Sequence, residues 1–524
     1  MVFLCCFRPS KVTPEGSPSA PAKIPLPSNL PLQAIPPSST LLREPTPSGT
    51  PPPPSNPSEL PNPSPLPLST DKVLAECPRL RVLVVGKSGA GKSSLISRVF
   101  GVKLASVSHQ KPGQCDIEEE IISLQNSCLV LHDSMGFEHG NTDTFNDVKN
   151  FIVDRSNENR PMKERLHVVW LCIKIPIAGD RVFETGDEKL IELAFDTGVP
   201  VIVVFTQYDV LVLSVFRRLP PSEDRERLSR DQATQKFKDS CLKLLDPFFE
   251  KYTQLLYVRT SGLSGAPPSK LDPTALDDLV RETRRLVEET FRGDAWIVSA
   301  MAQRASAQVK IEGAIAIGMK KYWHGIASGA QLSGTLEGCL TAVHNDMTAS
   351  WNFYDPEDLL RNQDFTDKIK KLAQFVTPST SDAKSWFSND TLQPLLGVAS
   401  GLGPASVVAV PAVAGIVLSF AFVSFITKAL RQTPETLRCF MGYIIDLTLV
   451  LEQLFHVTLS KAPSSLTNKD IDMAFENYKN SGLGMVHRRI REFVEAESFT
   501  KIVKGKEAQE KVKELIWEFS GVRG

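Results

Sequence analysis

Residues 80–94 of this chain read Leu-Arg-Val-Leu-Val-Val-Gly-Lys-Ser-Gly-Ala-Gly-Lys-Ser-Ser. The apolar run over 80–85 predicts a buried strand, and Leu-Ile-Ser-Arg-Val-Phe at 95–100 predicts a helix. The glycines between them let the backbone wrap closely, so that amide N–H groups point inward at the start of the helix. A strand, a glycine loop and a helix with the spacing GxxxxGK[ST] predict a loop that binds phosphate.

The loop contains the residues expected to contact the phosphates of a nucleotide. Lys92 is predicted to reach the β- and γ-phosphates, and the Ser93 hydroxyl is predicted to bind Mg²⁺. The predicted phosphate-binding residues are Gly86, Lys87, Ser88, Gly89, Ala90, Gly91, Lys92, Ser93 and Ser94. A phosphate loop alone does not choose between ATP and GTP, so the choice depends on later segments.

Two later segments predict contacts to the metal and to the base. Asp133 follows the apolar run 128–132 and is predicted to hold Mg²⁺ through water, while the Gly136 N–H would reach the γ-phosphate. The segment Thr206-Gln207-Tyr208-Asp209 follows a third apolar run and is similar to a guanine-reading [NT]KxD motif. Asp209 would accept hydrogen bonds from the ring N–H and amine of guanine, which adenine does not offer.

The remaining base contact is predicted after a strand at 254–259. There Thr260-Ser261-Gly262 follows the strand, and the backbone at Ser261 is predicted to contact the guanine oxygen. Gln207 stands where the motif usually has lysine, which predicts weaker packing across the base. An ATP-using signalling ATPase is the alternative, and Asp209 argues against it.

The set GKSGAGKS, DSMG, TQYD and TSG, in this order over residues 80–292, resembles the translation-factor-related class of P-loop GTPases. Within it, HDSMGFE followed by FTQYD is similar to fungal G domain-containing proteins, which share features with septin-like and immunity-associated GTPases. The resemblance implies binding of GTP or GDP with Mg²⁺ and a nucleotide-dependent conformational switch. Alternating strands and helices predict an α/β fold, a mostly parallel sheet covered on both faces.

Two departures from the GTPase pattern bear on catalysis. Residues 101–132 contain no threonine, and Ser108 is the hydroxyl chosen as a further Mg²⁺ ligand. Phe137 follows Gly136, where other GTPases carry a glutamine that orients water. Slow hydrolysis is therefore predicted, unless an activating partner or a second copy of the chain adds a group. No catalytic residue is assigned.

Composition predicts an arm before this domain and limits the partners. Twenty of the 38 prolines lie in residues 1–70, which predicts a disordered arm over residues 1–78. Cys5 and Cys6 near its tip are candidates for acylation, and two unmodified cysteines are the alternative. A net charge of −1 disfavours nucleic acid as a partner, and nine scattered cysteines favour a reducing, cytoplasmic location.

The chain after the predicted G domain (79–292) is expected to form a helical domain over residues 293–524. Apolar residues recur at helical spacing over 295–327, and 484–519 is predicted to be a charged amphipathic helix. Residues 395–427 are apolar and uncharged enough for either a buried helical hairpin or a membrane segment. The functional prediction is a slow GTPase switch whose nucleotide state the helical domain reads. The alternative is a non-hydrolysing GTP-binding scaffold or membrane-associated interaction module.

Overall fold

The computed structural model describes most of the chain after the proline-rich segment. The described residues are 69–102, 116–134, 142–177, 181–252, 255–261, 275–291, 293–317, 336–374, 376, 434–459, 461, 464–496 and 507–522. All of them lie within one compact unit that spans residues 62–524. Cys5, Cys6 and the apolar stretch 395–427 lie outside the described residues.

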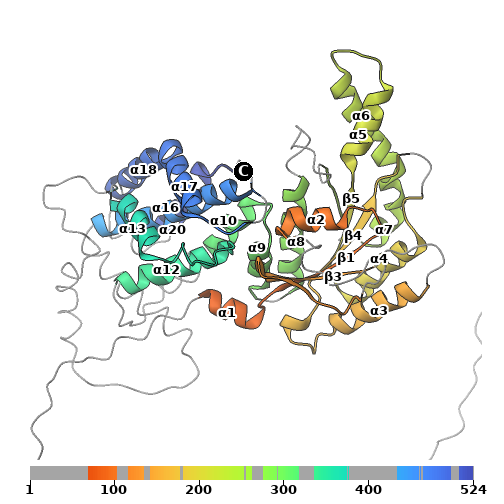
Figure 1. Cartoon of the computed structure of the whole chain (residues 1–524), viewed down its shortest axis with the longest axis horizontal. Helices are drawn as coiled ribbons and strands as arrows, with labels where there is room; N and C mark the ends of the chain where they lie inside the picture. The colour runs from red at the N-terminus through yellow and green to blue at the C-terminus, as the bar shows by residue number, and fades with distance from the viewer. Residues whose placement is uncertain are drawn as a thin grey trace, which may run out of the picture. The chain divides into compact units, whose positions relative to one another are not determined.

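A six-stranded sheet with the order β2-β3-β1-β4-β5-β6 forms the centre of the first domain (Figure 1). Its strands are β1 (Leu80–Val85), β2 (Ile121–Ser123), β3 (Asn126–Asp133), β4 (Val168–Lys174), β5 (Val201–Thr206) and β6 (Leu256–Arg259). Only β2 pairs antiparallel, as a hairpin with β3 at one edge, while the other neighbours in this sheet run parallel. The predicted mostly parallel α/β fold is therefore confirmed.

Alternate residues of β1 enter two different cores, because successive side chains of a strand point to opposite faces. Val82 and Val84 pack in one core, and Leu83 and Val85 pack in the other. The first core includes α1 (Ser69–Glu76), α2 (Lys92–Phe100), α8 (Ala275–Thr290) and α9 (Ala295–Ala302). The second includes α3 (Thr142–Ser156), α4 (Thr185–Thr197), α5 (Tyr208–Arg218) and α6 (Arg225–Ser240). Helices thus cover both faces of the sheet.

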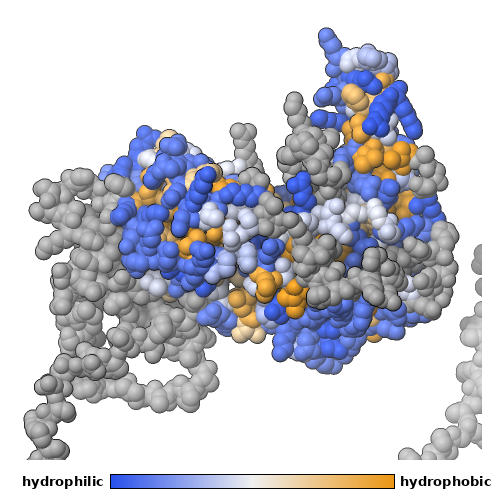
Figure 2. Space-filling model, viewed as in Figure 1, coloured by the Kyte–Doolittle hydropathy of each residue, from blue (hydrophilic) through white to orange (hydrophobic). Residues whose placement is uncertain are grey.

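The α5–α6 pair projects beyond the sheet layer, followed by α7 (Asp246–Lys251) at its base (Figure 1). Apolar side chains gather along this pair on the face shown in Figure 2, and Leu213 is among the exposed ones. Because α5 begins directly after β5, the start of this projection lies at the carboxyl end of the parallel strands.

The second domain is helical, as predicted. It contains α10 (Ala307–Ile315), α12 (Leu336–Trp351), α13 (Gln363–Gln374), α16 (Pro434–Leu459), α17 (Asn468–Ser481), α18 (Leu483–Ala496) and α20 (Glu507–Phe519). The 26-residue α16 is the central helix, and α13, α17, α18 and α20 all pack against it. Figure 2 shows mostly hydrophilic side chains over α17 and α18, which fits helices with one apolar face turned to α16.

Within the described part of the chain, α16 contains a stretch with the length of a membrane-spanning helix. Residues Leu437–Leu459 are long and apolar enough to cross a bilayer, but 89% of the most apolar window is buried inside the protein. Its buried Asp446 carboxylate is also paired internally, since it accepts hydrogen bonds from Tyr478 at 2.6 Å and from His487 at 3.0 Å. This stretch is the core helix of the second domain.

Three expected elements differ in the structure. Helix α1 lies inside the stretch predicted as a disordered arm, because the buried Asp346 carboxylate accepts hydrogen bonds from its first two amides, Ser69 and Thr70, at 2.9 Å each. The pattern over 295–327 is broken between α9 and α10, where the Gln303 side chain accepts from the amides of Ala305 and Ser306. The single helix expected at 484–519 is described as two helices, α18 and α20, and residues 497–506 between them lie outside the described residues.

Candidate nucleotide-binding site

The phosphate loop lies between β1 and α2, as the sequence predicts, and its shape requires glycine at its first position. Gly86 has φ +156°, and a Cβ added there would lie 2.4 Å from the Cys172 carbonyl oxygen on the neighbouring strand. Gly91 immediately precedes α2 with φ +85°, in the left-handed region that glycine adopts without strain. The loop is thus held close to β4 while its backbone turns into the helix.

Lys92 and Asp133 place opposite charges beside the loop. The Lys92 ammonium donates a hydrogen bond to the Gly86 carbonyl at 2.7 Å and lies 4.0 Å from an Asp133 carboxylate oxygen. Burial raises the pKa of the Asp133 carboxyl, and the Lys92 charge acts in the opposite direction. The Lys92 side chain therefore folds back over the loop, which is the position where it would meet a phosphate.

The residues present fit a hard divalent cation held partly by a nucleotide. Ser93 is the second residue of α2, and Asp133 ends β3, so a hydroxyl and a carboxylate approach from adjacent elements. Oxygen ligands of this kind suit Mg²⁺. Across the described ranges no three His, Cys, Asp or Glu side chains gather into a metal site of their own. Phosphate and water oxygens would have to complete the coordination. Ser108 and Gly136 lie outside the described residues.

The predicted base-reading segment is bonded directly to the phosphate loop. The buried Thr206 hydroxyl donates to the Ala90 carbonyl at 2.7 Å, and the side-chain amide of Gln207 donates to the Gly89 carbonyl at 2.9 Å. Gln207 itself is in the left-handed region with φ +63°, immediately before α5. The glutamine at the usual lysine position therefore connects the base-reading segment to the phosphate loop.

The third predicted segment joins the same place. The Tyr208 amide donates to the Thr260 carbonyl at 3.1 Å, and the Thr260 amide donates to the Phe205 carbonyl at 2.7 Å. These bonds hold Ser261 next to the start of α5, where half-buried Asp209 lies in the first helical turn. The structure thus brings together residues 86–94, 133, 206–209 and 261, which lie far apart in the sequence.

One group near the loop was not predicted. The Lys87 ammonium contacts the carboxylate of Glu184, a buried residue at the start of α4. Asp187 completes a capping box there by accepting from the Glu184 amide at 2.8 Å, and burial raises the pKa of Asp187 to about 6. The Glu-x-x-Asp spacing before an apolar helical pattern is the signal that could have identified this helix start.

Buried histidines brace the strands beneath the site. His132 donates from Nδ1 to the Ile117 carbonyl at 2.7 Å, so its Nε2 accepts from the Arg81 guanidinium at 2.7 Å. Burial lowers the pKa of His132 to about 4. His167 on the other side of β1 accepts from the Arg81 amide at 2.8 Å, and burial lowers its pKa to about 3. Both rings are therefore neutral structural groups.

Comparisons with known proteins agree with this arrangement. Residues 81–207 match a family model described as 50S ribosome-binding GTPase, and residues 359–522 match one described as Domain of unknown function (DUF8505). GTPase Der from Deinococcus deserti is 26% identical over 161 residues, which are 31% of this chain and 32% of Der. The chain thus spans about a third of the length of this curated relative.

Solved structures with weak similarity include two GTP-related proteins. A variant of Era from Aquifex aeolicus, described as bound to GDP.AlF4-, is 18% identical over 46% of this chain and 67% of its own, with a TM-score of 0.24. A probable GTP-binding protein EngB is 17% identical over 40% of this chain and 99% of its own, with a TM-score of 0.22.

Proposed function

We propose that the P-loop GTPase domain carried by residues 81–207 is a slow guanine-nucleotide switch coupled to the helical domain. The observation that supports it most is the direct bonding of Thr206 and Gln207 to the phosphate loop at 2.7 and 2.9 Å. This bonding joins the base-reading and phosphate-reading elements into one rigid frame, which one nucleotide of the right length would span. The septin-like and immunity-associated resemblance stays a prediction within this proposal.

Each residue of the frame has a separate task in binding. The amides of the loop and the start of α2 face the phosphates, and Lys92 exchanges its bond to the Gly86 carbonyl for phosphate oxygens. Ser93 and Asp133 would hold Mg²⁺, which when bound neutralises charge between the phosphates. Asp209 accepts two hydrogen bonds from guanine, and Ser261 contributes its backbone N–H to the guanine oxygen. Discrimination against adenine then rests on Asp209.

The turn between β2 and β3 supports coupling to the helical domain, because it connects the two segments that would respond to the γ-phosphate. The Arg304 guanidinium donates to the Gln125 carbonyl at 3.3 Å and also to the Asn352 carbonyl at the end of α12. The side-chain amide of Asn352 donates to the side-chain oxygen of Asn126 at 3.1 Å. A shift of the β2–β3 hairpin would therefore act directly on Arg304 and Asn352.

A buried lysine holds the same junction from the helical side. Lys310 is fully buried and donates to the carbonyls of Met301 and Trp351 at 2.8 Å each, which belong to the last turns of α9 and α12. Carbonyls in the last turn of a helix have no partner within the helix, so the Lys310 nitrogen satisfies one such carbonyl from each helix. Burial lowers the pKa of Lys310 well below its ordinary value. This contact fixes α9, which packs on the sheet, to α12 of the helical domain.

Slow hydrolysis of GTP is expected in a single-turnover assay. The assay compares GTP with ATP, each with and without lipid vesicles. GTP should be hydrolysed at on the order of 10⁻³ s⁻¹ or slower, because Phe137 stands where a water-orienting glutamine would lie. The Lys92→Ala variant sets the background rate of the preparation. Turnover of many GTP per second by the purified protein would contradict slow intrinsic hydrolysis, and equal use of ATP would contradict guanine selection.

A non-hydrolysing scaffold is the second candidate function. The lack of threonine over residues 101–132, together with Phe137, favours it over a cycling enzyme. In that case the same assay would give stable binding of GTP with hydrolysis no faster than the Lys92→Ala background. A membrane-associated module would differ from both by faster turnover or binding only when vesicles are present.

A further inference from the structure

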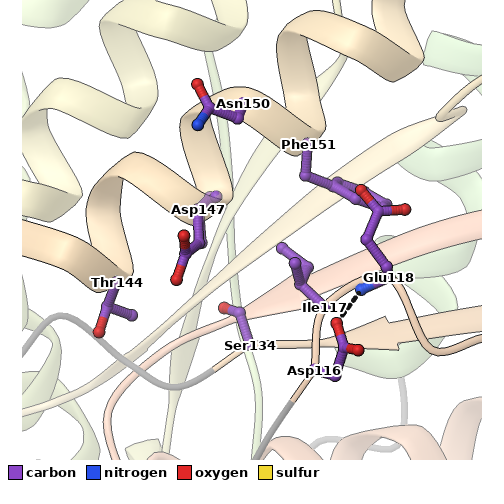
Figure 3. A pocket seen from close by; sticks show the side chains of 9 residues that line it. Asp116, Ile117, Glu118, Ser134, Thr144, Asp147, Asn150 and Phe151 are labelled. Carbon is purple, nitrogen blue, oxygen red and sulfur yellow. Dashed lines mark hydrogen bonds between the residues drawn. The ribbon is translucent and has the colours of Figure 1, made fainter.

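A cavity of about 350 Å³ lies between α3 and the residues that lead into β2, beside the carboxyl end of β3 (Figure 3). Its volume is at the lower end of the range for ligand sites in proteins. Ile117, Val148 and Phe151 give it an apolar side, and Asp116, Asp147 and Ser134 give it a polar one. The cavity is separate from the phosphate loop and from the base-reading segment, so the proposed nucleotide does not use it.

The carboxylates make the cavity electronegative. Asp147 is exposed on α3, and Asp116 accepts one hydrogen bond, from the Glu118 amide at 2.9 Å. A third carboxylate, Glu118, is paired with Arg155 at 3.0 Å, which cancels its charge. Asp147 and Asp116 thus carry the negative charge available to a ligand, which favours a cationic ligand over an anionic one.

Ser134 gives an independent indication that a ligand forms a hydrogen bond here. This side chain is only 4% exposed, and its hydroxyl has no hydrogen-bond partner among the residues that the structure describes. Figure 3 shows the hydroxyl directed toward the side of the cavity where Thr144 and Asp147 lie. Leaving a buried hydroxyl unpaired costs about 1–3 kcal/mol, so a partner for it is expected.

We propose that this cavity binds the side chain of an arginine or lysine presented by a partner protein. The methylene stem of such a side chain packs on Ile117, Val148 and Phe151, while the charged end pairs with Asp147 and donates to the Ser134 hydroxyl. A bare metal ion fits less well, because within the described parts of the chain no trio of metal-binding side chains gathers. The inference deepens the proposed function, since Ser134 directly follows Asp133, but the cavity can be tested without nucleotide.

The test is a methyl-detected NMR titration of the full chain, without nucleotide, using the Ile117 and Val148 methyl groups as reporters inside the cavity. The probe is the capped tripeptide acetyl-Gly-Arg-Gly-amide, and the control probe carries citrulline, which has the same shape without the charge. Saturable shifts of both methyl signals with the arginine peptide, at least tenfold weaker with citrulline, are expected. No saturable shift, or equal binding of the two peptides, would overturn the proposal.

Two variants locate the binding within the cavity. Asp147→Asn should weaken the arginine peptide about tenfold, while Asp154→Asn on the same helix, outside the cavity, should not. Ser134→Ala should weaken it without lowering thermal stability, because it removes an unpaired buried hydroxyl. Unchanged peptide affinity in Asp147→Asn and Ser134→Ala would refute the site. If spermidine shifts the same methyl signals more strongly than the peptide does, the ligand is a polyamine and the proposed protein partner is wrong.

The affinity of each variant for GDP is measured in the same samples. Retained peptide binding with no GDP binding would contradict the proposed function and leave the cavity proposal standing. Retained GDP binding with no peptide binding would overturn the cavity proposal and leave the proposed function standing.

Discussion

The Asp209→Asn variant is expected to lose about a hundredfold or more in affinity for GTP and to gain affinity for xanthosine triphosphate. The carboxylate accepts two hydrogen bonds from guanine, each worth about 1.5–3 kcal/mol because one partner is charged, and 1.4 kcal/mol corresponds to a factor of ten. Asparagine presents an N–H in place of one acceptor, which opposes guanine and matches the extra carbonyl of xanthine. Competition against a fluorescent GDP analogue measures both affinities.

A matched control is Asp224→Asn, which changes the same residue type at the start of α6 in the same projection. Asparagine is as good as aspartate before a helix, so this variant should leave both affinities unchanged. An unchanged preference for guanine in Asp209→Asn would refute base reading by this residue and would reopen the ATPase alternative.

Acidification is expected to unfold the protein steeply between pH 6 and pH 4.5. Three buried histidines stay neutral in the fold, because burial lowers the pKa of His132 and His344 to about 4 and that of His167 to about 3. Their pKa in the unfolded chain is about 6.5, so unfolding takes up nearly three protons at pH 5. Their stabilising contribution is complete above pH 6.5 and is lost as pH falls toward the folded values.

Asp187 acts in the opposite direction. Its folded pKa of about 6 exceeds the unfolded value, so unfolding releases about one proton at pH 5 and the net uptake is about two. The free energy of unfolding should therefore fall by about 3 kcal/mol per pH unit near pH 5. Urea unfolding at a series of pH values measures this slope.

The His344→Gln variant should reduce that slope by about one proton. His344 donates from Nε2 to the Leu360 carbonyl at 2.7 Å and accepts from the Tyr443 hydroxyl at 2.8 Å, and glutamine can make similar bonds without titrating. A slope that stays the same in His344→Gln, or a wild-type stability that is flat between pH 7 and pH 5, would contradict the assignment of a neutral buried ring.

The parts of the fold that the sequence predicted are those with strong local patterns. The run at 80–85 and the GxxxxGK[ST] loop placed β1, the phosphate loop and α2. The motif order located Asp133 and Thr206 at strand ends and Asp209 in the first turn of the helix after β5. The edge strand β2 has a weaker local pattern, because it is short and only Ile121–Ser123 pairs with β3.

The features that the sequence did not reveal depend on contacts between distant residues. Helix α1 begins at Ser69 because Asp346, more than 270 residues later, binds its first amides. Lys310 joins two helix ends by its ammonium, yet in the sequence it is one lysine in a helical pattern. The Lys87–Glu184 contact and the Arg304 junction are likewise long-range, and periodicity carries no signal for them.

Nucleotide state is proposed to reach the helical domain through the β2–β3 turn, and hydrogen–deuterium exchange of the full chain tests this coupling. Exchange is compared between GDP and a non-hydrolysable GTP analogue in the wild type, in Asn352→Gly and in Asp358→Gly. Asn352 and Asp358 both have positive φ, near +50°, so glycine keeps either backbone and removes only the side chain. A nucleotide-dependent difference in the last turn of α12 is expected to persist in Asp358→Gly and to shrink in Asn352→Gly, which loses the side-chain bond to Asn126 and keeps the Arg304 bond to the Asn352 carbonyl. A difference confined to residues 79–292 in the wild type, or one that Asn352→Gly leaves intact, would contradict the proposed coupling.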